Sequence, residues 1–64
     1  MSDSEGPELS SMLTLLEELR TRVSAMAERL TGTDKDMIAA DLFEVERALR
    51  QGETRLGKLV DVLR

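Results

Sequence analysis

The sequence predicts an all-α protein: an antiparallel two-helix coiled-coil hairpin, which is expected to pair with a second copy into a four-helix bundle. Apolar residues recur at alternating steps of three and four along two stretches, the spacing of one helix face in a coiled coil. A short polar segment around Gly32 separates the two stretches. The chain has 64 residues and no cysteine, so regular helix packing, self-association or both must supply its stability.

The first predicted helix runs from about residue 8 to residue 31. Residues 1–6 are polar and acidic and are predicted to form a flexible tail. Pro7 suits the first position of a helix, and Glu8 suits the positive end of the helix dipole. The predicted heptad seam of this helix, positions a and d together, consists of Leu9, Met12, Leu16, Leu19, Val23, Met26 and Leu30.

A turn is predicted at residues 31–33, followed by a second helix from about 34 to 63. Gly32 is the expected left-handed cap of the first helix, because glycine adopts positive φ without steric cost. Thr33 or Asp34 can cap the second helix. The heptad then resumes at Ile38, Leu42, Val45, Leu49, Gly52, Leu56, Leu59 and Leu63.

Gly52 leaves two alternatives open for the second helix. The helix could continue through it, or it could end there and a short third helix could begin near Glu53. The heptad phase is the same on both sides of Gly52, which favours one continuous helix. In that case Met12 is predicted to pack opposite Gly52, a flexible side chain facing a missing one.

The linker between the helices is so short that they must run antiparallel. Facing residues then have numbers that sum to roughly 64–68. Two pairs of opposite charge fit this register on the two flanks of the seam: Arg20 with Glu46, and Arg22 with Asp41.

The residue types that are missing argue against catalysis. The chain contains no His, Cys, Trp or Tyr, and Phe43 is its single aromatic residue. Thiol nucleophiles, Ser–His and Cys–His pairs and Cys/His zinc sites are therefore excluded. Asp34 and Asp36 resemble only a fragment of a calcium-binding loop and are better explained as residues at a helix start. We predict no catalytic activity, no metal site, no cofactor and no small-molecule substrate.

Charge and hydropathy bear on location and on partners. The formal net charge is −4 and the isoelectric point is about 4.7, which makes general nucleic-acid binding unlikely. No apolar run approaches the roughly 18 residues of a membrane-spanning helix. Residues 1–8 lack the features of a secretory signal, so a cytoplasmic location and no membrane association are expected.

The predicted hairpin has more apolar surface near its open end than two helices can bury against each other. We therefore predict a homo-oligomer, with a dimer favoured, although a second, different protein could also cover this surface. The predicted function is that of a small, non-catalytic protein–protein interaction or assembly module. Its predicted oligomer interface consists of Leu13, Leu15, Phe43, Val60, Val62 and Leu63.

Basic residues concentrate near the C-terminus and support an alternative function. Residues 1–46 carry a net charge of −7, whereas residues 47–64 carry +3. The alternative is a small nucleic-acid-associated regulator or cofactor protein that docks through the basic face of the second helix. The candidate docking residues are Arg47, Arg50, Lys58 and Arg64.

Overall fold

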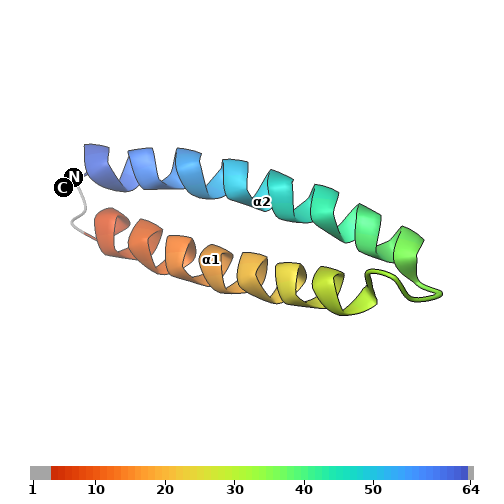
Figure 1. The fold of residues 1–64 in the computed structure, drawn as a ribbon. Helices are drawn as coiled ribbons and strands as arrows, with labels where there is room; N and C mark the ends of the chain where they lie inside the picture. The colour runs from red at the N-terminus through yellow and green to blue at the C-terminus, as the bar shows by residue number, and fades with distance from the viewer. Residues whose placement is uncertain (1–3, 64) are drawn as a thin grey trace.

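The protein is a single antiparallel helical hairpin (Figure 1). The computed structural model describes residues 4–63, in which helix α1 spans Glu5–Leu30 and helix α2 spans Asp36–Val62. The two helices pack against each other along their whole length, and the described residues contain no strand. The hairpin measures 52 × 14 × 11 Å, and its radius of gyration is 14.9 Å, compared with about 10.7 Å for a compact domain of this size.

Helix α1 begins earlier than the sequence pattern suggests. Its first residue is Glu5, so Glu5 and Gly6 belong to the helix and not to the predicted tail, whose first three residues lie outside the described part of the chain. The backbone N–H of Glu8 donates to the Ser4 carbonyl at 3.0 Å. Pro7 is tolerated because the N–H groups of the first turn need no helical partner. Glu5 and Glu8 both lie in this turn, where the helix dipole favours negative charge.

The turn between the helices confirms the role predicted for Gly32. Its φ is +79°, and its backbone N–H donates to the Asp36 Oδ1 atom at 2.7 Å. The Thr33 hydroxyl donates to the Leu30 carbonyl at 2.6 Å and accepts from the Lys35 N–H at 3.1 Å. These bonds hold residues 33–35 in a turn, so α2 begins at Asp36, two residues after the predicted start.

Helix α2 continues without a break through Gly52 and Gly57, and the alternative of a third helix is therefore wrong. A Cβ atom added at Gly52 would lie 3.5 Å from the Leu16 Cδ2 atom. The prediction that Met12 packs opposite Gly52 is wrong, because Leu16 is the side chain that meets this position, at the upper end of the predicted range of sums.

Gly57→Ala should stabilise the protein. A Cβ atom there meets nothing within 4 Å, and alanine removes roughly 0.5–1 kcal/mol of glycine's entropic cost inside a helix. The melting temperature should therefore rise by about 4–8 °C for each kcal/mol of added stability. Gly32→Ala should have the opposite effect, because φ at that position is +79°. A fall in the melting temperature of Gly57→Ala would contradict this assignment.

The interface between the helices is a single row of side chains on each helix, which we call the seam row. Members of the row follow each other at steps of three and four and are buried or half-buried, apart from the exposed Leu63 at the end of α2. On α1 the row is Gly6, Leu9, Leu13, Leu16, Arg20, Val23, Ala27 and Leu30. On α2 it is Ala39, Leu42, Glu46, Leu49, Glu53, Leu56, Val60 and Leu63.

Half of the predicted seam is correct. The row that contains Leu16 and Val23 lies between the helices as predicted. The prediction is wrong for Met12, Leu19 and Met26, which are 43%, 46% and 44% exposed. Each helix is rotated about its own axis, so that on α1 the next residue along the chain (Leu13, Arg20 or Ala27) faces the other helix instead.

Candidate interaction surface

Large apolar side chains remain exposed along the entire hairpin. Eight of them immediately precede a residue of the seam row and therefore lie about 100° back around their helix. The exposed fractions of these eight range from 43% at Met12 to 75% at Val62. We call this set the apolar face. It consists of Met12, Leu15, Leu19 and Met26 on α1 and of Ile38, Val45, Leu59 and Val62 on α2.

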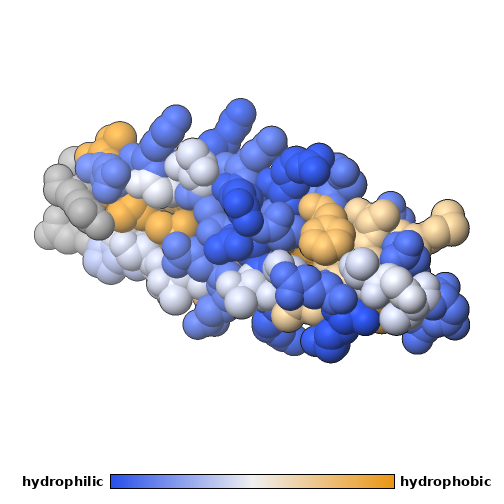
Figure 2. All heavy atoms as spheres, viewed as in Figure 1, coloured by the Kyte–Doolittle hydropathy of each residue, from blue (hydrophilic) through white to orange (hydrophobic). Residues whose placement is uncertain are grey.

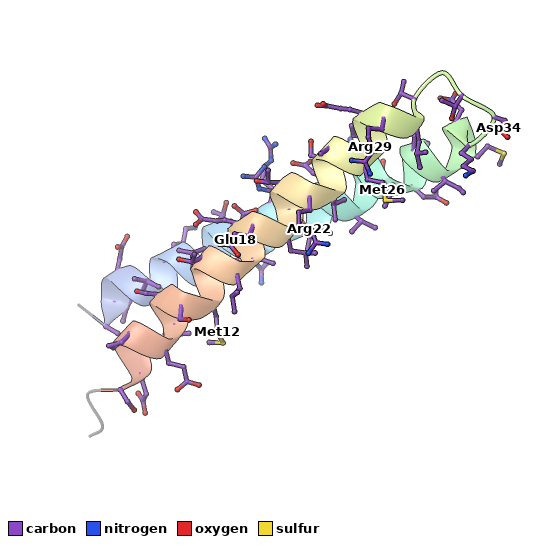
Figure 3. All side chains as sticks on the ribbon, turned by 90° about the horizontal axis from the view of Figure 1, so that it is seen from below. Met12, Glu18, Arg22, Met26, Arg29 and Asp34 are labelled. Carbon is purple, nitrogen blue, oxygen red and sulfur yellow. The ribbon has the colours of Figure 1, made fainter. Side chains whose placement is uncertain are left out.

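The two halves of the apolar face lie on the same side of the hairpin. On both helices the exposed residues are rotated from the seam row in the same sense along the chain. Because the helices run in opposite directions, this common rotation brings both sets to one side. Figure 3 shows Met12, Arg22 and Met26 along that side of α1, whereas Glu18 points away from α2.

Two shallow hollows interrupt the apolar face, and both are formed by residues of α1 with one residue of α2. The central hollow is lined by Leu19, Arg22, Val23, Ala25, Met26 and Arg29 together with Leu42 of α2. The terminal hollow is lined by Glu5, Glu8, Leu9 and Met12 together with Leu63 of α2. Each contains four residues of α1 at relative positions i, i+3, i+4 and i+7, which is the set that forms a hole for a side chain in a coiled coil.

Charged residues of the seam row pair with one another between the helices. Arg20 pairs with Glu46 at 3.4 Å, as predicted, and also forms an ion pair with Glu53. Glu46 in turn accepts a hydrogen bond of 2.7 Å from Arg50. Figure 2 shows hydrophilic side chains over the middle of both helices on the face seen there, with hydrophobic groups mainly towards the two ends.

These contacts shift two pKa values. The hydrogen bond to Glu53 is the main reason that the pKa of Arg20 is raised above its ordinary value. The hydrogen bond from Arg50 is the main reason that the pKa of Glu46 is lowered, and Arg20 adds to that effect. The predicted pair Arg22–Asp41 does not form within the described hairpin, because both residues lie outside the seam row.

Glu46→Gln should make stability less sensitive to acid. The pKa of Glu46 is lower in the folded protein than its ordinary value of about 4.5, so ionised Glu46 stabilises the fold above that pH. This stabilisation disappears as the pH falls through the lowered pKa. Melting temperatures of wild type and Glu46→Gln should therefore differ at pH 7 and converge at an acidic pH at which Glu46 is protonated. The control is Glu44→Gln, whose ion pair with Arg47 is largely exposed and should matter little. An equal difference at both pH values would contradict the assigned role.

The residues predicted for the oligomer interface fall into two groups. Leu13 and Val60 belong to the seam row, and Val60 is only 5% exposed, so α1 and α2 already cover them. Leu15 and Val62 belong to the apolar face. Leu63 packs against Gly6: a Cβ atom added at Gly6 would lie 3.9 Å from the Leu63 Cβ atom. This contact exists because α1 starts early enough to reach the end of α2.

Phe43 is separated from the other predicted interface residues. It follows Leu42 of the seam row, and therefore lies on the flank opposite to the apolar face. Its exposed fraction is 39%. The structure thus does not bring the six predicted residues together at the open end.

The basic residues proposed for docking are partly occupied by neighbouring acids. They are Arg47, Arg50, Lys58 and Arg64. Arg47 pairs with Glu44 at 3.2 Å, and Arg50 pairs with Glu46 at 2.7 Å. Lys58 lies on the outer surface of α2, and the last of the four is outside the described residues.

Most residues of the apolar face belong to the predicted heptad seam, which was expected to lie between the two helices. Six of its eight members have the heptad spacing that predicted the seam between the two helices. The spacing identified an apolar row on each helix. It did not show whether that row faces the other helix or lies exposed on the outside of the hairpin.

Within residues 4–63, no group of three potential ligands is placed to hold a metal ion. No helix in this part of the chain combines the length and the apolar character needed to cross a membrane. Comparison with known proteins finds no match: no family model, no curated protein and no solved structure is significantly similar to the chain.

Proposed function

We propose that this protein is a small, non-catalytic interaction module that self-associates through its apolar face, with two hairpins forming a four-helix bundle. The proposal differs from the sequence-based expectation in one respect. The surface involved extends from the open end to the turn, instead of being confined to the open end.

The observation that supports this proposal best is the near absence of a core within the described hairpin. Only Ala27, Ala39 and Val60 are buried there, and no large side chain is fully enclosed. A helix normally buries an apolar stripe wider than the seam row. Two hairpins placed with their apolar faces together would give each helix a second apolar contact and would create a central core.

The surface area agrees with a missing partner of similar size. The solvent-accessible surface is 5010 Å², whereas a compact protein of this mass exposes about 4,100 Å². The excess is on the order of the 800 Å² that each partner buries in a standard interface.

Self-association accounts for the exposed residues better than docking to a nucleic acid does. Arg47 and Arg50 are already engaged by acidic side chains of α2. A second copy of the chain, by contrast, needs no surface other than the apolar face. Copies of one chain also form closed, symmetric assemblies readily.

Light scattering over a dilution series tests this proposal. We expect a molar mass near twice the 7.2 kDa of one chain, falling towards 7.2 kDa on dilution together with the helix content. A fully helical protein of 7.2 kDa at every concentration would overturn the proposal.

A further inference from the structure

We propose that six charged residues on the side of the apolar face select a second copy of this chain as its partner, by forming ion pairs between the two copies. This inference rests on the proposed self-association and specifies what the surface recognises. Like the members of the apolar face, each of the six immediately precedes a residue of the seam row. We call them the face charges. They are Glu5, Glu8, Arg22, Arg29, Asp41 and Arg55.

The face charges have no ion-pair partner within their own hairpin. All six are exposed, and none forms an ion pair with another of residues 4–63. The charged residues of the seam row differ in this respect, since Arg20 pairs with both Glu46 and Glu53. The face charges are therefore available to any partner that covers the apolar face.

The helix dipole accounts for only half of the face charges. Three of them lie in the first or last turn of α1, where the dipole favours acids and bases respectively. The other three, Arg22, Asp41 and Arg55, lie inside the helices, beyond the turns in which the dipole acts. Contact with a partner explains all six positions.

The sum of the face charges indicates what kind of partner fits. Three acids balance three bases, so the net charge of −4 on the chain comes entirely from residues outside this set. A surface that meets a copy of itself must be self-complementary, and a surface of one sign would repel its copy. A foreign partner of either sign would place like charges against three of the six. A second copy is therefore the partner that the face charges favour.

The register of the hairpin determines where the face charges lie along its length. Gly6 contacts Leu63, and Leu16 contacts Gly52, so residues whose numbers sum to about 68 lie at the same height. Two hairpins that pair symmetrically through their apolar faces have their turns either at the same end or at opposite ends. In the first arrangement α2 of one copy meets α1 of the other. In the second, each helix meets its own counterpart.

Unlike charges meet in both arrangements. With the turns at the same end, Asp41 of one copy lies in height between Arg22 and Arg29 of the other. With the turns at opposite ends, Arg29 of one copy reaches the height of Glu8 of the other, and Asp41 reaches that of Arg55. The face charges are thus complementary to those of a second copy whichever way that copy is turned.

Mixing two charge-reversed variants tests this proposal. The acidic variant, Arg22→Glu with Arg55→Glu, has five acids and one base among the face charges, and the basic variant, Glu8→Lys with Asp41→Lys, has the reverse. Both new residue types are good helix formers. The dissociation constant of each variant alone should rise roughly tenfold, because every reversed charge occurs twice in a symmetric dimer. An equimolar mixture should recover the mass of the wild type by light scattering and its helix content by circular dichroism.

A variant with the same change of net charge elsewhere serves as the control. Arg47→Glu with Lys58→Glu adds as much negative charge as the acidic variant does, but outside the face charges. Arg47 follows a residue of the seam row and lies on the opposite flank, and Lys58 lies on the outer surface of α2. The mass of this control should remain that of the wild type.

The outcomes separate this inference from the proposed function. Charge-reversed variants that keep the wild-type mass, or that dissociate and stay apart when mixed, would overturn the role of the face charges and leave self-association intact. A control that dissociates as readily as the acidic variant would also overturn it, because net charge would then govern assembly. A wild-type mass of 7.2 kDa at every concentration would overturn the proposed function itself. Dissociation of each variant alone, with recovery in the mixture, would establish the pairing between copies.

Discussion

Leu19→Glu should convert the assembled protein into separate chains and lower its helix content. Leu19 lies in the middle of the apolar face, lines the central hollow and is 46% exposed in a single hairpin. Burying a leucine contributes about 1.5–3 kcal/mol, and a symmetric dimer contains the site twice. The dissociation constant should therefore rise by at least about a hundredfold, since 1.4 kcal/mol corresponds to a factor of ten. Glutamate is itself a good helix former, so a loss of helix would come from the lost assembly.

Thr21→Glu is the matched control for this variant. It introduces the same charge two residues away, on the exposed outer surface of α1. Its molar mass by light scattering and its helix content by circular dichroism should remain those of the wild type. If both variants dissociate equally, net charge and not the apolar face controls assembly. If Leu19→Glu keeps the wild-type mass, the apolar face is not the interface.

The helix content of Leu19→Glu carries separate information. With only three buried residues in the described hairpin, folding and assembly should be linked, and mass and helix content should fall together. A monomeric variant with full helix content would mean that the seam row alone stabilises the hairpin.

The sequence was sufficient to predict the two helices, the turn and their antiparallel pairing. These features depend on local signals, such as the positive φ available to Gly32, and on a repeat maintained over many turns. The ion pair between Arg20 and Glu46 also followed from the register of a short turn. Each of these features depends only on contacts within one chain.

The rotation of the helices about their own axes could not be predicted in the same way. The heptad offers two candidate rows beside Leu16 and Val23: an apolar row with Leu19 and Met26, and a mixed row with Arg20 and Ala27. Considered alone, a two-helix hairpin would be expected to bury the apolar row. In the structure the mixed row faces the partner helix, where small residues allow close approach and Arg20 finds its acidic partners.

Under the proposed self-association the chain must satisfy two interfaces, and this requirement would explain the choice. The mixed row can be buried by the partner helix, because its charges pair with each other across the seam. The apolar row is then free for a second hairpin, which needs an apolar surface to associate without specific charge partners throughout. The useful signal in the sequence was the width of the apolar pattern, which covers more than one helix face.

Ala39→Leu should destabilise the hairpin, because the mixed row depends on small residues near the turn. Ala39 is 2% exposed, and the register places it at the height of Leu30. Adding three carbon atoms to an enclosed site costs about 1–3 kcal/mol, and the short turn prevents the helices from separating there. The melting temperature at a fixed protein concentration should fall by about 4–8 °C for each kcal/mol. Ala40→Leu is the control, since the adjacent Ala40 is exposed and the same substitution should change stability little. Greater stability in Ala39→Leu than in Ala40→Leu would mean that the helices are not closely packed at this end, and that the apolar row could turn inward after all.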